Sequence, residues 1–487
     1  MPKARVYVLY TGGTFGMRED PGMPGNPLSV MSAREIAKIL PDPRQFQKDA
    51  DIEVRFDRLD RLMDSSSMTP RDWVLIAERI KNNYQHHDGF VIIHGTDTLS
   101  YTASALSFMF ENLGKPIVMT GSQLPLSNSR TDAALNYGHA VMIAGYKATD
   151  LPLIPEVIVV FASRILRGCR TRKMSASAWT GFESPNAPPL GAIGEHIKIY
   201  ENQIGPAPAA DLDLQLTTEL VTEVLDISLY PGLTPAHLRS ILSLANVKGV
   251  VLRTYGTGNA PEDPDFLSAL ADGIGKGEKT VVNITQCPQG SVEMGLYAAS
   301  VGLLDVGVIS GLDMTPEAAL TKLMVLLGNR VGDQIKLQMQ INQRGEQSQN
   351  LFDLHYKTWK TLAGGYSDYA QPDRRFERDA LTTSVIRIRR LKIELESRDL
   401  DNPCIHVFMN APKASVSDLV DGDHARLILT IRLAGGSLQQ EFSLAETLNR
   451  QKVRNAAGDS DIALTFVATA GVKFGFDELS LSLLTNA

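Results

Sequence analysis

Threonine and glycine residues at the end of the first predicted strand are the first candidates for chemistry in this sequence. Residues 4–10 are apolar and β-prone, and Thr-Gly-Gly-Thr at 11–14 follows them directly. Glycines allow the backbone to turn sharply and let a ligand approach it closely. Thr14 is thereby presented at the carboxyl end of a strand, where open α/β sheets bind their ligands. If this motif is considered by itself, the simpler interpretation is a turn that ends the strand and has no catalytic role.

Two further groups carry side chains that could activate a threonine hydroxyl. Thr96 and Asp97 follow the predicted strand 89–93, and Lys173 ends the basic run 167–173. A threonine hydroxyl is a poor nucleophile unless a base takes its proton. An aspartate and a lysine that share a second threonine could form such a base, provided that burial and neighbours hold the lysine near neutrality.

The spacing of these residues leaves simpler alternatives open. Asp97 could cap the helix that follows it, and Lys173 could be one solvated cation among several. His94, at a strand end, could be structural. The serines at 65–67 could form only a turn before a helix.

The elements that must position these residues alternate between strand and helix. Strands are predicted at 4–10, 52–59, 89–93, 116–119 and 156–162. Helices are predicted at 32–40, after the capping residues Ser32 and Glu35, from Thr69-Pro70 onward, and at 132–144. This alternation favours an α/β fold with a parallel sheet and right-handed crossovers. The polar motifs then fall at the edge of the sheet where strands end.

A second, smaller α/β lobe and a β-rich tail follow. Strands predicted at 223–229, 249–254 and 280–285 alternate with helices that begin at Thr234-Pro235 and Thr315-Pro316. Short β-prone runs at 384–396, 404–409, 425–433, 462–467 and 479–484 predict an antiparallel β-sandwich. The predicted domains are a catalytic N-terminal lobe at 1–204, a linker at 205–222, a second lobe at 223–345, a polar, irregular connecting segment at 346–380, and an accessory β-sandwich at 381–487.

Composition and charge exclude several classes of protein. The 487 residues are 43% hydrophobic and 21% charged, which is ordinary for a globular protein, and the net charge of −7 offers no basic field to nucleic acid. No apolar stretch of signal-peptide or membrane-spanning character precedes the first strand. Cys169, Cys287 and Cys404 are widely spaced, which suits a reducing compartment and gives no metal-ligand spacing. We therefore expect a cytoplasmic protein with no cofactor and with neither nucleic-acid nor membrane partners.

Taken together, the motifs resemble those of the bacterial-type L-asparaginases. The resemblance rests on Tyr-Thr-Gly-Gly-Thr-Phe-Gly-Met at 10–17, His-Gly-Thr-Asp-Thr at 94–98 and Thr-Gly-Ser-Gln-Leu-Pro at 120–125. Matches to the cytoplasmic type I branch lie at 62–70, 184–186, 253–261 and 283–287. The similarity runs from residue 4 to about residue 345, or about 70% of the chain.

The resemblance implies a two-lobed fold, an asparaginase activity and a set of site residues. Thr14 matches the family's nucleophile, and Thr96, Asp97 and Lys173 match its second catalytic group. The residues that match its substrate-binding positions are Gly13, Ser65, Ser66, Gly95 and Ser122. Some type I enzymes also bind asparagine at an allosteric site, and the residues that match it are Arg253, Thr285 and Cys287. The implied assembly is a homodimer or homotetramer, with small-molecule asparagine as substrate.

Two departures from the family pattern keep other functions open. Many relatives carry a tyrosine in the mobile lid after the first motif, whereas the stretch 18–28 has none and places Met23 nearest to that position. The second departure is the β-rich tail, whose partner the sequence does not identify. The alternatives are an amidase for glutamine, for a tRNA-linked amide or for another amide, and a sensor that binds a small molecule with little turnover.

Overall fold

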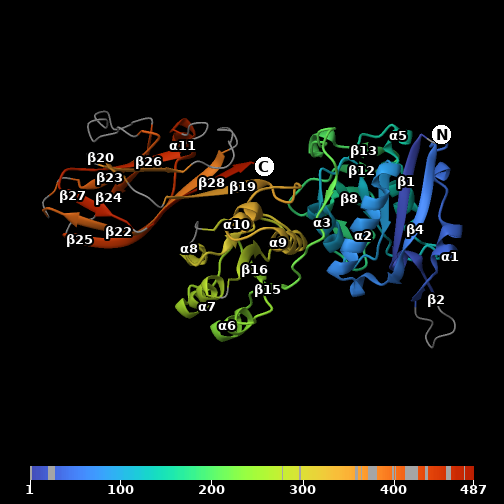
Figure 1. Ribbon diagram of the computed structural model, residues 1–487, viewed down its shortest axis with the longest axis horizontal. Coiled ribbons are helices and arrows are strands. Elements are labelled where there is room, and N and C mark those ends of the chain that lie inside the picture. Colours follow the sequence, from blue (N-terminus) through green and yellow to red (C-terminus); the bar gives the residue numbers. More distant parts are fainter. Residues whose placement is uncertain are drawn as a thin grey trace. The chain divides into compact units, whose positions relative to one another are not determined.

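The computed structural model of the chain divides it into two compact units, Met1–Met294 with Gly302–Ser348, and Gly295–Val301 with Gln349–Ala487 (Figure 1). The residues that it describes are 3–19, 28–276, 278–294, 298–356, 360–362, 365–370, 381–397, 400, 402–411, 426–433, 437–456, 462–476 and 478–486. Among them, no helix is long and apolar enough to cross a membrane.

The first unit begins with an eight-stranded sheet in the order β13-β12-β9-β8-β7-β5-β1-β4. Its parallel strands are β4 (Ile52–Met63), β1 (Ala4–Gly12), β5 (Gly89–Ile93), β7 (Ile117–Thr120) and β8 (Val157–Phe161). The predicted parallel sheet is confirmed. The structure adds an antiparallel edge of β9 (Arg164–Arg167), β12 (Gly191–Ile193) and β13 (Ile197–Ile199), which the sequence analysis did not predict.

Helices cover both faces of this sheet, and the residues of β1 show how. Tyr7 and Leu9 belong to one apolar core, whereas Val6 and Val8 belong to another. Successive side chains of a strand point to opposite faces, so a strand covered on both faces is apolar throughout. The first core includes residues of α2 (Pro70–Asn83) and α3 (Leu99–Met109), and the second includes residues of α4 (Ala133–Ala144).

Local capping defines the predicted helices of this lobe. α1 (Ala33–Ile39) has Ser32 as its N-cap in a capping box with Glu35, as predicted. Thr69 forms a second capping box with Asp72 at the start of α2, where Pro70 occupies the first turn. Other short elements are α5 (Tyr146–Thr149), the hairpin of β2 (Met17–Glu19) and β3 (Leu28–Val30), and the pair of β6 (Phe110–Glu111) with β14 (Gln215–Leu216), which follows the lobe.

The second lobe has a four-stranded parallel sheet in the order β15-β16-β17-β18. The strands are β15 (Val224–Ser228), β16 (Gly249–Thr254), β17 (Thr280–Thr285) and β18 (Ile309–Ser310). The helices are α6 (Pro235–Leu242), α7 (Pro264–Gly275), α9 (Pro316–Asn329) and α10 (Asp333–Gln340), with α8 (Ala298–Asp305) at the division between the units. Thr234 and Thr315 cap α6 and α9 through their side chains, as their Thr-Pro pairs predict.

The second unit contains two antiparallel sheets, as the β-prone runs predict. One has β19 (Gln349–Tyr356), β28 (Glu478–Asn486), β22 (Leu381–Leu395), β25 (Gln439–Thr447) and β27 (Val472–Gly475). The other has β20 (Lys360–Leu362), β21 (Gly365–Ala370), β26 (Ile462–Ala468), β23 (Cys404–Met409) and β24 (Leu427–Arg432), and α11 (Arg450–Ala456) completes the unit. Three of these strands, β19 to β21, lie within the stretch 346–380 that we expected to be irregular. They form because β19 pairs with β28 and β21 pairs with β26, both far along the chain.

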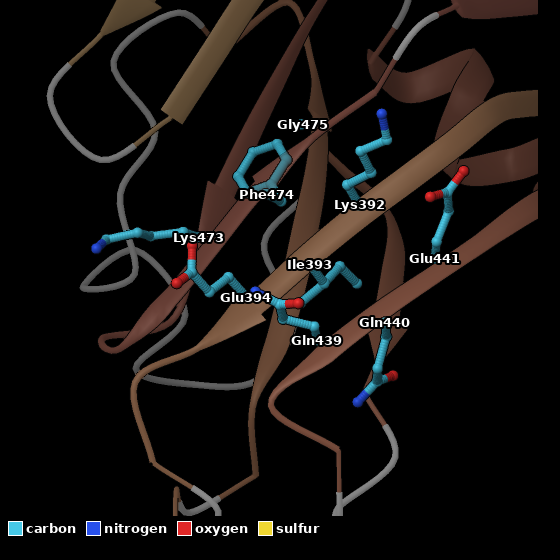
Figure 2. Close-up of a pocket in the computed structure, with 9 residues that line it drawn as sticks. All are labelled: Lys392, Ile393, Glu394, Gln439, Gln440, Glu441, Lys473, Phe474 and Gly475. Atoms are coloured by element: carbon cyan, nitrogen blue, oxygen red, sulfur yellow. The ribbon is translucent and has the colours of Figure 1, made fainter.

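A polar hollow of about 540 Å³ lies on the second unit among β22, β25 and β27 (Figure 2). Lys392 of β22 is in register with Glu441 on one side and with Gly475 on the other. None of the site residues predicted from the sequence lines this hollow.

Candidate active site

Thr14 is held at the end of β1 by a turn that only glycine can form. Gly12 and Gly13 have φ angles of 115° and 83°, in the region that other residues rarely adopt. A Cβ atom on Gly13 would lie 2.3 Å from the Cα of Gly95. The turn therefore brings the first motif into direct contact with the second. Thr14, partly buried, follows in a 3₁₀ turn, Thr14–Gly16.

Thr96 and Asp97 share one cation. The Nζ atom of Lys173 donates hydrogen bonds to Thr96 Oγ1 at 3.0 Å and to Asp97 Oδ1 at 2.7 Å. Thr96 is 7% exposed, and the Lys173 side chain is 20% exposed. The structure thus joins Lys173 to Thr96 and Asp97 in one hydrogen-bonded group, although the two motifs are far apart in the sequence.

The basic run 167–173 is not a solvated loop, because its arginines are paired with carboxylates. It forms the end of β9, a 3₁₀ turn (Gly168–Arg170) and the short strand β10 (Arg172–Lys173), which pairs with β11 (Phe182–Glu183). The ion pairs are Arg167 with Glu156 at 2.5 Å, Arg170 with Asp313 at 3.0 Å and Arg172 with Glu317 at 3.7 Å.

Arg170 is a residue whose role the sequence analysis did not identify. It is 2% exposed and donates hydrogen bonds to the carbonyls of Asp313 and Gly345 and to the Ser348 hydroxyl. These bonds attach the strand of Lys173 to the second lobe. The only signal in the sequence was the cluster of basic residues itself, which does not reveal the partner of each cation.

Ser65 lies against the second motif. It is 2% exposed in the 3₁₀ turn Ser65–Ser67, and a Cβ atom on Gly95 would lie 2.5 Å from its Oγ. Its carbonyl accepts a hydrogen bond of 2.8 Å from the Thr98 hydroxyl. Ser66 is exposed, and its N–H donates to the carboxylate of Asp64. The structure therefore brings Gly13, Gly95 and Ser65 into one continuous contact.

Ser122 reaches the same edge from β7. The preceding Gly121 packs so closely that a Cβ atom there would lie 2.4 Å from the His94 carbonyl oxygen and 3.7 Å from Thr96 Cγ2. The Ser122 hydroxyl is buried, and the described part of the chain provides it with no hydrogen-bond partner. It therefore has hydrogen-bonding capacity left for a ligand at this edge.

Arg253, Thr285 and Cys287 lie in the second lobe, at the ends of β16 and β17, and of these three described residues only Thr285 and Cys287 are hydrogen-bonded to each other. Arg253 makes an ion pair of 2.8 Å with Asp226. The Thr285 hydroxyl donates to the Gly256 carbonyl at 2.6 Å and accepts from the N–H of Cys287. Cys287 is exposed, and its thiol is free. The bonds of these residues stay within the second lobe.

Met23 and the question of a bound metal complete the account of the predicted site. Met23 falls in 20–27, outside the described residues, although the β2–β3 hairpin on either side of that stretch is described. For metals, the described residues contain no group of three or more His, Cys, Asp or Glu side chains that could hold an ion.

Comparison with known proteins gives consistent matches over this region. The family model "Asparaginase, N-terminal" matches residues 5–205, and "Glutaminase/Asparaginase C-terminal domain" matches residues 223–339. L-asparaginase 1 of Escherichia coli K12 is 43% identical over 348 residues, which are 71% of this chain and 98% of that protein. The 60 kDa lysophospholipase of Mus musculus is 37% identical over 67% of this chain and 59% of its own length.

A solved structure supports the same relationship. L-asparaginase I from Vibrio cholerae superposes with a TM-score of 0.63 at 41% identity, covering 71% of this chain and 99% of that one. The matched region has two α/β lobes, and the two antiparallel sheets of the second unit are additional. On this evidence, the chain belongs to the asparaginase family.

Proposed function

We propose that this protein hydrolyses the side-chain amide of L-asparagine to aspartate and ammonia, with Thr14 as the nucleophile. The observation that carries the proposal is the contact of Lys173 Nζ with both Thr96 Oγ1 and Asp97 Oδ1, next to the Gly13–Gly95 contact that precedes Thr14. Each of these residues has a simpler role by itself, but a solvated cation would not bond to both a buried threonine hydroxyl and the neighbouring carboxylate.

In the proposed reaction, Thr14 Oγ1 forms a bond to the amide carbon, and the C–N bond then breaks. The hydroxyl proton of Thr14 leaves with ammonia. Water next attacks the acyl-enzyme and breaks the new C–O bond, which releases aspartate and restores Thr14. Thr96, Asp97 and Lys173 move the protons, a function that general acid–base groups perform with a gain of about 10²- to 10⁴-fold in rate.

Backbone donors would stabilise the tetrahedral intermediate. The N–H groups around Gly13 and Thr96 lie where the two motifs touch. One such donor contributes about 3 kcal/mol to the transition state. Ser65, Ser66 and Asp97 would bind the substrate's α-carboxylate and α-ammonium groups, with Gly95 and Ser122 completing the pocket.

Ammonia release from asparagine and from glutamine, measured with the full chain, tests this proposal. We expect the wild-type chain to release ammonia from asparagine. We expect Thr14→Ala and Lys173→Met each to abolish or strongly reduce this activity. Activity on asparagine that survives in Thr14→Ala would contradict the nucleophile assignment. Faster turnover of glutamine than of asparagine would instead favour the alternative amidase.

Regulation and assembly are part of the proposal. Binding of asparagine to Arg253, Thr285 and Cys287 would make the rate sigmoidal in asparagine, and Cys287→Ala would make it hyperbolic. Hyperbolic kinetics of the wild type would remove the effector site. We propose a homodimer or homotetramer in the cytoplasm, which analytical ultracentrifugation and cell fractionation would test. Comparing the full chain with residues 1–350 would show whether the accessory sheets serve assembly, regulation or partner binding.

A further inference from the structure

His94 is a completely buried histidine that the proposed reaction does not use. It follows β5 and precedes Gly95, and its backbone N–H donates to the Thr120 carbonyl at 2.8 Å. An ionisable ring at 0% exposure needs partners for both ring nitrogens, since an unpaired buried polar group is costly.

The ring's contacts fix its protonation. Nδ1 lies 2.6 Å from the carbonyl oxygen of Gly95, and Nε2 lies 2.9 Å from the hydroxyl oxygen of Thr102 and from the Met68 sulfur. A carbonyl oxygen can only accept, so Nδ1 carries the proton. The neutral ring then accepts the Thr102 hydroxyl proton at Nε2. Burial also lowers the pKa of His94 to about 4, which keeps the ring neutral at physiological pH.

The Gly95 carbonyl belongs to the same peptide group as the Thr96 N–H. A trans peptide is planar, with its C=O and N–H pointing in opposite directions, so a hydrogen bond that holds Gly95 O also fixes the direction of the Thr96 N–H. Hydrogen bonds in a chain polarise one another, and a donor on the carbonyl makes the N–H of that peptide a better donor. Gly95 is in addition the residue that both Gly13 and Ser65 contact.

We propose that His94 is a positioning residue which, through its Nδ1–H bond to Gly95, aims the Thr96 N–H at the oxyanion of the reaction. The inference rests on the proposed function, because it assigns the source of the oxyanion donor in that site. It makes no use of a charge on His94.

Two substitutions separate this role from simple packing. In His94→Asn the amide Nδ2 takes the place of Nδ1, so the bond to Gly95 can be kept. In His94→Gln the amide reaches the place of Nε2, so the bond to Thr102 can be kept while that to Gly95 is lost. We expect kcat on asparagine to fall by roughly 10- to 100-fold in His94→Gln with little change in KM, and by much less in His94→Asn.

A matched pair at His87 controls for loss of a buried histidine. His87 is 6% exposed, and its Nδ1 lies 3.0 Å from the Asn83 carbonyl at the end of α2. His87→Asn and His87→Gln should lower the melting temperature and leave kcat unchanged. Equal kcat in His94→Asn and His94→Gln would overturn the inference. A wild-type chain that releases no ammonia from asparagine would overturn the proposed function instead.

The ring's tautomer can be measured on the wild-type chain, so the test does not depend on folding of a variant. With ¹⁵N-labelled histidine, the His94 ring should show a protonated Nδ1 and an unprotonated Nε2, both unchanged between pH 7.5 and 5.5. The His94 ring signals are identified because they disappear in His94→Asn or His94→Gln. If neither variant folds, they are identified by magnetisation transfer to the Thr102 side chain. A neutral ring with its proton on Nε2 and an unprotonated Nδ1 would also overturn the inference, because such a ring cannot donate to Gly95.

Discussion

The Lys173 ammonium donates a 3.0 Å hydrogen bond to the Thr96 hydroxyl, across 77 residues of sequence. The same ammonium lies 2.7 Å from Asp97, so two neighbouring residues of one motif meet the last residue of the basic run. Because the arginines of that run have carboxylate partners of their own, Lys173 is the cation placed to serve Thr96.

Removing this ammonium should slow the reaction more than it weakens substrate binding. We expect Lys173→Met to lower kcat for asparagine by about 10²- to 10⁴-fold, since the group acts in proton transfer. Steady-state ammonia release gives kcat and KM separately. Lys147→Met, which breaks a surface ion pair with Asp88, is the control and should retain wild-type kcat. A change confined to KM would contradict the role in proton transfer.

Adding a methyl group to Gly13 should disrupt the contact between the two motifs. The new Cβ atom would lie 2.3 Å from Gly95 Cα, and the φ of 83° is unfavourable for alanine. Because a displacement of about 1 Å at a reacting group can cost about 10²-fold, we expect Gly13→Ala to lower kcat at least that much. Gly194→Ala is the control, since nothing lies within 4 Å of the position that its new Cβ atom would take. Wild-type kinetics in Gly13→Ala would show that the turn tolerates a side chain.

The buried ion pair of Lys322 and Glu346 should matter for stability. Both side chains are 0% exposed, and their charged atoms lie 2.5 Å apart. Lys322 also donates to the carbonyls of Met339 and Ile341. Breaking one partner of such a pair costs about 3–5 kcal/mol, because it leaves the other charge buried and uncompensated.

Glu346→Gln tests this cost through urea unfolding followed by circular dichroism. The expected loss is in that range for the transition of the first unit. Asp272→Asn, which removes the surface partner of Arg239 and Lys276, should cost far less, because water screens an exposed ion pair. An equal loss in the free energy of unfolding in the two variants would show that burial does not make the Lys322–Glu346 pair more important for stability than a surface pair.

Burial of a neutral His94 should make the folded chain less stable in mild acid. Its pKa is about 4 in the folded protein, against 6.5 for an ordinary histidine. Between these values the unfolded chain binds a proton that the folded chain does not. The stabilisation is therefore complete above about pH 6.5 and is lost as the pH falls toward 4. From pH 7 to pH 5 this single group should remove about 2 kcal/mol from the free energy of unfolding.

The comparison of wild type with His94→Asn isolates that contribution. Urea unfolding at pH 7 and pH 5 should show a smaller loss in the variant, because asparagine does not titrate. His196→Asn, at an exposed histidine, should show the wild-type loss. The same pH dependence in His94→Asn as in the wild type would contradict the assigned burial.

Local signals in the sequence were sufficient for the scaffold. The Thr69-Pro70 and Thr315-Pro316 starts of α2 and α9 were predictable, because caps and first-turn prolines act through their own backbone neighbours. The central strands were predictable because burial on both faces requires continuous apolar runs. By contrast, β19 lies in a polar stretch and exists through its pairing with β28, more than a hundred residues away. No local pattern contains that information.

For the site, the sequence by itself determined the candidate residues and the family that their motifs resemble. The resemblance singled out Lys173 within the basic run, although its four cations are alike as local charge. Only the tertiary structure decided the partners of the other three, because Arg167, Arg170 and Arg172 pair with carboxylates that lie elsewhere in the sequence. It likewise decided that His94 faces the Gly95 carbonyl. Both outcomes depend on which distant groups share a buried position, where an unpaired charge or polar atom costs most.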